Sequence, residues 1–143
     1  MVISGSGVAL DRAIQLAEAA GARRVTRLSV SIAAHSRLMS GIVDEFSRAV
    51  GATPIRLPQV SVVANVTARP LASVEDIRRE MVDQLTSSVR WVESVGFMAA
   101  QGVTHCIEVG PKEVLTGLIP RINKDVRTTA CGTVSAVQAL VSG

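Results

Sequence analysis

Hydrophobic and polar residues alternate over residues 27–32, and the period then changes. Apolar side chains occupy the even positions and polar ones the odd positions, which is the pattern of a half-buried β-strand. From Ser36 onward apolar residues recur at every third or fourth position, which predicts a helix that runs to Val50. The sequence therefore predicts a strand from about residue 25, a short turn and then a helix.

The same two periods recur along the rest of the chain. Short apolar runs bounded by turn residues predict further strands over 60–64, 103–109 and 126–131. Amphipathic patterns predict the remaining helices over about 7–20, 73–85, 89–101, 114–122 and 134–141. Ser73 is expected to cap its helix, and Pro120 is expected to kink its helix or end it early. The alternation of strands and helices predicts an α/β fold with a mostly parallel sheet.

The composition agrees with this fold class. Hydrophobic residues make up 48% of the chain but aromatic residues only 2%, so the core has to be built from aliphatic side chains. Such a composition suits a parallel sheet covered by helices. A length of 143 residues corresponds to one domain, or to part of a larger one.

The distribution of charge argues against nucleic-acid binding. The net charge is +3, but the densest basic clusters, Arg23-Arg24 with Arg27 and Arg78-Arg79, are short and have no neighbouring aromatic residues on which bases could stack. A mild basic bias suits an acidic partner or an anionic ligand equally well. We expect no nucleic-acid partner.

The two cysteines and the hydropathy pattern bear on location and metal binding. Cys106 and Cys131 lie far apart in apolar runs, which predicts buried free thiols in a reducing cytoplasm. No Cys or His pair has metal-ligand spacing, so no metal site is expected. No apolar run has the length of a membrane span and no signal-peptide pattern is present, so we expect a soluble cytoplasmic protein without a membrane partner.

His35 is the first candidate for chemistry, because it lies in the turn between the predicted strand and helix, where α/β proteins often place functional residues. The alternative is a structural hydrogen-bonding role; His105, in mid-strand, is expected to be a packed or surface residue. A histidine base needs a nucleophile. A serine on a nucleophile elbow requires G-x-S-x-G, and this pattern is absent from the 143 residues.

Several segments, in one order, resemble the C-terminal part of malonyl-CoA:acyl carrier protein transacylases, the acyltransferases of fatty-acid and polyketide synthesis. The resemblance runs from Val2 almost to the C-terminus. The matching residues are Val30-Ser31 with His35 to Met39, Asn65-Val66-Thr67, Gln84-Leu85 with Val89-Arg90-Trp91, Met98 to Val103, and Glu108 to Pro111 with Val114 to Leu118.

The resemblance implies a fold and a domain division. The expected fold is the C-terminal part of an α/β-hydrolase-like acyltransferase domain with a mostly parallel sheet, plus the end of an inserted ferredoxin-like subdomain. Residues 1–32 would end the ferredoxin-like small subdomain, and residues 33–143 would form the C-terminal part of the large subdomain.

The resemblance also implies a reaction. Malonyl or a related acyl group moves from coenzyme A to the phosphopantetheine thiol of acyl carrier protein through an acyl-serine intermediate, with malonyl-CoA as substrate and no bound cofactor. His35 matches the general base, and the backbone carbonyl of Gln84 matches the group that orients it. The serine would come from an N-terminal half, so the isolated chain is expected to be inactive.

Some residues depart from the family pattern. Ala34 replaces the Ser or Phe that often precedes the histidine, which leaves the choice between malonyl and a branched acyl group open. Ser88 stands where Pro is common, and Lys112-Glu113 replaces the Gly-Lys that usually follows Gly-Pro.

A second hypothesis remains beside the enzyme. The missing serine and the basic bias also fit a non-catalytic α/β module that binds an acidic carrier protein or a partner subunit. No residue is predicted to bind a cofactor.

Overall fold

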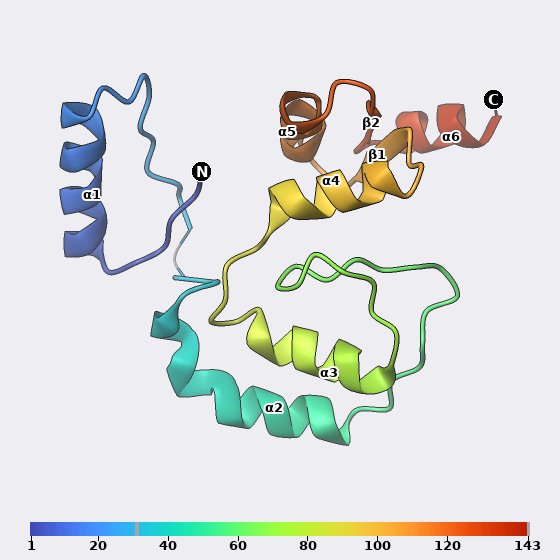
Figure 1. Ribbon diagram of the computed structural model, residues 1–143, viewed down its shortest axis with the longest axis horizontal. Coiled ribbons are helices and arrows are strands. Elements are labelled where there is room, and N and C mark those ends of the chain that lie inside the picture. The colour runs from blue at the N-terminus through green and yellow to red at the C-terminus, as the bar shows by residue number, and fades with distance from the viewer. Residues whose placement is uncertain (31, 143) are drawn as a thin grey trace. The chain divides into compact units, whose positions relative to one another are not determined.

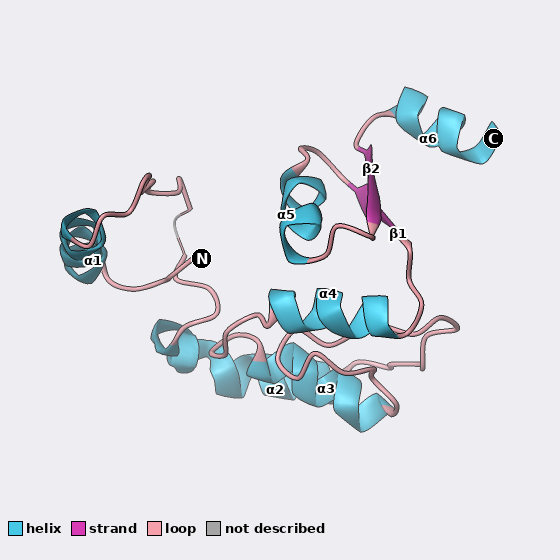
Figure 2. Cartoon of the chain, turned by 45° about the horizontal axis from the view of Figure 1, so that its top comes forward, coloured by secondary structure: helices cyan, strands magenta, loops and turns pink. Residues whose placement is uncertain are grey.

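The computed structural model describes residues 1–30 and 32–142, which form helices and one small sheet (Figures 1 and 2). In chain order the elements are α1 (Gly7–Ala19), the 3-10 helix η1 (Arg37–Ile42), α2 (Val43–Ala52), α3 (Val74–Asp83), α4 (Trp91–Ala100), β1 (His105–Val109), α5 (Val114–Ile122), β2 (Arg127–Cys131) and α6 (Val134–Ser142). Contacts divide the chain into two compact units, Met1–Val89 and Arg90–Gly143. The predicted boundary at residues 32 and 33 stays a prediction.

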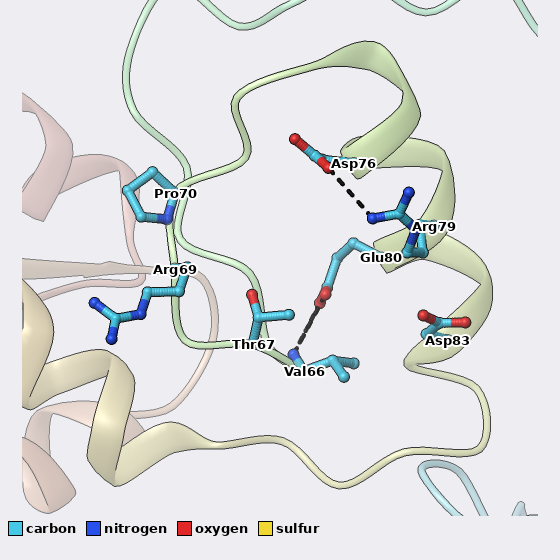
Figure 3. Close-up of a pocket in the computed structure, with 8 residues that line it drawn as sticks. All are labelled: Val66, Thr67, Arg69, Pro70, Asp76, Arg79, Glu80 and Asp83. Atoms are coloured by element: carbon cyan, nitrogen blue, oxygen red, sulfur yellow. Dashed lines mark hydrogen bonds and ion pairs between the residues drawn. The ribbon is translucent and has the colours of Figure 1, made fainter.

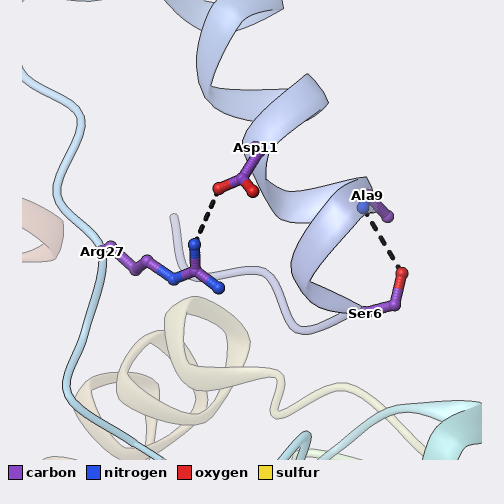
Figure 4. Close-up of polar contacts among 4 residues, drawn as sticks. All are labelled: Ser6, Ala9, Asp11 and Arg27. Atoms are coloured by element: carbon purple, nitrogen blue, oxygen red, sulfur yellow. Dashed lines mark hydrogen bonds and ion pairs between the residues drawn. The ribbon is translucent and has the colours of Figure 1, made fainter.

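Helix α1 opens the first unit and begins at a side-chain cap. The Ser6 hydroxyl accepts the Ala9 backbone N–H at 3.3 Å, which satisfies one of the amides that a helix start leaves without a partner (Figure 4). Arg27, in the segment after the helix, forms a 2.7 Å ion pair with Asp11 of α1. Both side chains are more than half exposed, so this pair contributes little stability.

Helices α2 and α3 of the first unit lie side by side and are joined by a side chain (Figures 1 and 2). The Arg78 guanidinium on α3 donates to the Val50 carbonyl and, at 2.9 Å, to the Thr53 carbonyl, where α2 ends. These bonds satisfy carbonyls that a helix end leaves free. The predicted Ser73 cap of α3 is confirmed, because its hydroxyl accepts the Asp76 N–H at 3.0 Å.

The second unit contains a β-α-β arrangement. Strands β1 and β2 are parallel, with a register that runs from His105 opposite Arg127 to Val109 opposite Cys131, and α5 connects them. The buried core consists of Val95, Ile119 and Val126, with Trp91, Met98, Ala99, Cys106 and Ile122 packed against it. The parallel pairing and the aliphatic core agree with the sequence prediction.

Two predicted strands do not form in the described part of the chain. Residues 25–30 and 32 are not part of a sheet, and Ser31 of that strand lies outside the described residues. Segment 60–64 is reduced to a single antiparallel bridge between Val63 and Pro70. An alternating pattern predicts an extended backbone with one apolar face, but a strand also needs a neighbour to complete its hydrogen-bond ladder.

Pro120 was expected to kink its helix or to end it early; the helix does not end there, and the kink stays a prediction. Helix α5 runs on to Ile122, and the Asn123 N–H still donates to the Ile119 carbonyl at 2.9 Å. Proline cannot donate to the carbonyl four residues earlier, that of Thr116. The Thr128 hydroxyl of β2 donates to this carbonyl instead, at 3.4 Å, so the missing donor comes from a neighbouring element.

Within the described residues, no helix combines the length and the hydrophobicity needed to cross a membrane.

A carboxylate ties β1 to the start of α5. The two Glu108 oxygens accept the backbone N–H groups of Thr116, at 2.7 Å, and Leu115, at 3.1 Å. These bonds, that of Thr116 foremost, hold the pKa of Glu108 below its ordinary value of 4.5. A depressed folded-state pKa stabilises the fold above the ordinary value, and this contribution is lost as the pH falls through the folded-state pKa.

We expect Glu108→Gln to lower the thermal unfolding midpoint at pH 7, because the amide oxygen replaces only one of the two acceptors. The difference from the unchanged chain should narrow below pH 4.5, the ordinary value at which the carboxylate of the unfolded chain takes up its proton. Glu113→Gln is the matched control, since Glu113 makes no side-chain cap bond to α5. Circular dichroism melts at pH 7 and pH 3.5 measure the effect, and equal midpoints for E108Q and the unchanged chain at pH 7 would contradict it.

Lys112 carries strain that a glycine would remove. Its φ of 75° lies in the left-handed region, which is costly for a residue with a Cβ. We expect Lys112→Gly to be more stable than Lys112→Ala by about 1 kcal/mol, because both variants remove the long side chain but only one keeps the Cβ. Urea unfolding of the two variants measures the difference, and an alanine variant as stable as the glycine variant would refute it.

Candidate active site

His35 lies in a tight turn before η1, in the first unit. The predicted helix after it begins as η1 and continues as α2 to Ala52. Ser36 caps η1: its hydroxyl accepts the Leu38 N–H at 3.3 Å and donates to the Ala33 carbonyl at 2.7 Å. One serine side chain therefore fixes the backbone on both sides of His35.

The backbone of His35 is held in an uncommon conformation. Its φ of 60° lies in the left-handed region, where histidine is found more often than most residues with a Cβ. Such a conformation costs on the order of 1 kcal/mol and persists only where the surrounding structure requires it. The left-handed turn leaves the His35 side chain exposed.

The structure brings together the two residues that the sequence analysis named. The Nδ1 atom of His35 lies 2.7 Å from the backbone carbonyl oxygen of Gln84. A carbonyl oxygen can only accept, so this bond requires the proton on Nδ1. In neutral imidazole the other nitrogen, Nε2, is then an acceptor, which is the state a general base needs.

The Gln84 carbonyl is available because α3 ends there. Gln84 is the C-terminal cap of α3, and its own N–H donates to the Glu80 carbonyl at 3.1 Å. Carbonyls in the last turn of a helix have no donor within the helix and carry a partial negative charge. The helix end therefore offers an acceptor to the imidazole N–H.

Two further residues of this site were not predicted from the sequence. The Asn65 side-chain amide donates to the Gln84 side-chain oxygen at 3.1 Å. Glu80, which is only 8% exposed, accepts the backbone N–H of Asn65 at 2.6 Å and that of Val66 at 3.2 Å. A signal for Glu80 was present in its spacing: it lies one helical turn before Gln84, on the same face of α3.

A hollow of about 250 Å³ lies beside Glu80 (Figure 3). The Glu80 carboxylate points to the Val66 N–H, and Arg79 forms a 3.5 Å ion pair with Asp76 along α3, on one side of the hollow. The lining is Val66, Thr67, Arg69, Pro70, Asp76, Arg79, Glu80 and Asp83. Asp76, Arg79 and Glu80 bond to one another or to backbone, which gives these three charges a structural explanation.

The other candidate groups lie elsewhere. His105 is exposed on β1 of the second unit, with Nε2 2.8 Å from the Thr129 hydroxyl, as expected of a surface histidine. Cys106 and Cys131 are free thiols, half-buried and buried. Among residues 1–30 and 32–142 no three His, Cys, Asp or Glu side chains are grouped so that they could hold a metal ion.

Comparison with known proteins gives consistent matches. The malonyl CoA-acyl carrier protein transacylase of Staphylococcus aureus (strain COL) is 38% identical over 138 residues, which cover 96% of this chain and 45% of the relative. That of Bacillus subtilis (strain 168) is 37% identical over 130 residues, covering 91% and 41%. No family model matches the chain.

Solved structures agree. The malonyl-CoA:acyl carrier protein transacylase of Xanthomonas oryzae pv. oryzae has a TM-score of 0.89 at 34% identity, covering 96% of this chain and 44% of that one. A type II polyketide malonyl-transacylase in complex with its acyl carrier protein also has a TM-score of 0.89, at 38% identity, covering 97% and 45%.

These matches are all acyltransferases of one fold, so the predicted fold class is confirmed. Over 96% of its length the chain is similar to malonyl-CoA:acyl carrier protein transacylases, and it corresponds to the C-terminal part of these relatives. It spans about 45% of the length of the relatives that it matches.

We expect Ser36→Ala to loosen the turn that carries His35. The loss of a helix cap costs about 1 kcal/mol in the free energy of unfolding. The His35 ring resonances should also move, because the bond from Ser36 to the Ala33 carbonyl is lost. Ser6→Ala is the matched control, since it removes the cap of α1 and should leave the His35 resonances in place. Urea unfolding and proton NMR measure both effects; unchanged His35 resonances in S36A would contradict the proposed restraint.

Proposed function

We propose that this chain supplies the general-base histidine of an enzyme that transfers a malonyl or related acyl group from coenzyme A to acyl carrier protein. The observation that carries the proposal is the 2.7 Å contact between His35 Nδ1 and the Gln84 carbonyl, in a chain 38% identical to a malonyl CoA-acyl carrier protein transacylase. The contact fixes the proton on Nδ1 and leaves Nε2 free to accept one. No resident cofactor is needed for this chemistry.

The reaction proceeds in two halves with one base. Nε2 of His35 takes the proton of a serine hydroxyl, and the serine oxygen attacks the thioester carbonyl. The coenzyme A thiolate then leaves and takes this proton from the imidazolium. Nε2 then takes the proton of the phosphopantetheine thiol, whose sulfur attacks the acyl-serine ester. The serine oxygen leaves and regains the proton. A carbonyl partner fixes the tautomer as an aspartate would, and stabilises the imidazolium less.

The serine belongs to a segment outside these 143 residues. The chain contains no G-x-S-x-G elbow and spans about 45% of its relatives' length. Its apolar side chains at Leu28, Val30, Ile32, Ile107 and Val109 are 43–79% exposed, as expected if they pack against a further part of the protein. We propose an N-terminal half as the partner that covers them.

The acyl carrier protein is the second proposed partner. One matched structure is a malonyl-transacylase in complex with its acyl carrier protein, and carrier proteins are acidic, whereas this chain has a net charge of +3. The free thiols of Cys106 and Cys131 support a reducing cytoplasm as the location.

A non-catalytic module that binds a carrier protein is the second candidate. The absent elbow and the positive net charge favour it. The exposed His35 ring, whose Nδ1 is already bonded, favours the enzyme, because a docking surface has no use for a fixed tautomer.

The chain alone should not become acylated by malonyl-CoA, because it lacks the nucleophile. When the chain is mixed with the N-terminal half of a family member, one of the two polypeptides should gain the mass of a malonyl group. That polypeptide should then transfer the malonyl group to acyl carrier protein. His35→Ala in the mixture should slow both steps at least 100-fold, the contribution expected of a general base. Intact-mass spectrometry follows both steps.

His105→Ala is the matched control, because His105 belongs to the other unit and should leave both rates unchanged. Acylation of the H35A mixture at the control rate would remove His35 from the mechanism. Binding of acyl carrier protein without transfer in the complete mixture would favour the binding module.

A further inference from the structure

We propose that Asn65 is a positioning residue for the His35 base. Asn65 acts on His35 through the side chain of Gln84, and Glu80 holds Asn65 in place. This inference rests on the proposed function of His35. It concerns the part of the site that holds the orienting carbonyl in place.

Gln84 has two oxygens, and each accepts a hydrogen bond from a different residue. Its backbone carbonyl faces His35 Nδ1 at 2.7 Å, and its side-chain oxygen accepts the Asn65 amide at 3.1 Å. Beyond the end of α3 the peptide after Gln84 is held by one shorter-range bond, from the Leu85 N–H to the Val82 carbonyl at 3.2 Å, so its carbonyl is held less firmly than one inside the helix. The bond from Asn65 restrains the same residue from its side chain, which limits the movement of this carbonyl.

Asn65 is itself fixed by a rigid turn. The Ala64 N–H donates to the Arg69 carbonyl at 2.8 Å, and the Ala68 N–H donates back to the Ala64 carbonyl at 3.0 Å. Ala64 and Ala68 are both buried, and Ala68 has a left-handed φ of 54°. A turn with two buried residues and a left-handed backbone position cannot shift without breaking its own bonds.

Glu80 fastens this turn to α3. Its carboxylate accepts the backbone N–H groups of Asn65 at 2.6 Å and Val66 at 3.2 Å (Figure 3). Bonds from amides to a carboxylate are stronger than those between neutral groups, and a buried carboxylate requires them. Glu80 and Gln84 lie one helical turn apart on α3. The loop turn around Asn65 therefore holds the end of this helix at two neighbouring side chains.

The proposed consequence is a change of tautomer. When Gln84 is loosely held, its carbonyl no longer faces Nδ1 continuously, and neutral His35 also populates the form with its proton on Nε2. That form cannot act as the base at Nε2. Removing the Asn65 amide should therefore lower kcat/KM of the reconstituted enzyme roughly 10-fold, part of the 100- to 10,000-fold that general-base catalysis supplies.

The test reads the tautomer directly in the 143-residue chain labelled with nitrogen-15. Long-range proton–nitrogen spectra of the neutral imidazole distinguish Nδ1–H from Nε2–H by the shifts of the two ring nitrogens. We expect the Nδ1–H form in the unchanged chain, and a mixture in Asn65→Ala and in Gln84→Met. The methionine keeps the length of the side chain and the backbone carbonyl of residue 84, and removes the side-chain amide whose oxygen Asn65 binds.

Three further variants make the result specific. Asn123→Ala removes an asparagine whose side chain caps a turn in the other unit, and should leave the tautomer unchanged. Asn65→Asp should restore the Nδ1–H form, because the Gln84 amide can turn and donate to the new carboxylate. The double variant N65A/Q84M should contain no more of the Nε2–H form than either single variant, since both substitutions remove the same bond.

A pure Nδ1–H form in Q84M would overturn the inference and leave the proposed function standing. Should N65A fail to fold, Q84M decides alone, because it leaves the turn and its bonds to Glu80 unaltered. An Nε2–H form in the unchanged chain would instead contradict the proposed function itself, because the carbonyl would then not orient the base.

Discussion

The site depends on one directional fact: a carbonyl oxygen accepts hydrogen bonds and cannot donate them. The 2.7 Å contact between His35 Nδ1 and the Gln84 carbonyl therefore decides which imidazole nitrogen carries the proton. Two local structures make the contact geometrically available. One is the left-handed turn pinned by Ser36, and the other is the end of α3, where a carbonyl is without a helical partner.

Burial of charge reinforces this arrangement. A carboxylate removed from water is destabilising unless donors surround it, and Glu80 finds its donors in the backbone of the 65–66 turn. The turn also needs Glu80, because the backbone N–H groups of Asn65 and Val66 would otherwise lack this acceptor. This mutual requirement links a loop to the same helix that presents the carbonyl, so the stability of the turn and the orientation of the His35 ring are coupled.

The sequence predicts the local part of this structure well. The change of period at Ser36, the Ser73 cap and the two strands of the second unit follow from spacing and from capping chemistry, which act between residues close in the chain. Strands 25–32 and 60–64 were predicted from alternation, which describes a face and carries no information about a pairing partner. The continuation of α5 past Pro120 could not be predicted from local propensity, because the hydroxyl that donates to the Thr116 carbonyl comes from β2.

The candidate site was predicted only in part, for the same reason. His35 follows from its place in a turn, and Gln84 follows from a family resemblance. Asn65 and Glu80 were missed because their bonds join residues 19 and 15 positions apart, and no period in the sequence records such a pairing. The matching segment at 65–67 marked the turn without indicating what it holds.

His35 and the carbonyl that accepts its hydrogen bond belong to one compact unit, Met1–Val89. An imidazole that is oriented within its own unit is ordered during folding, so the entropy of fixing this ring is not left for a later binding step.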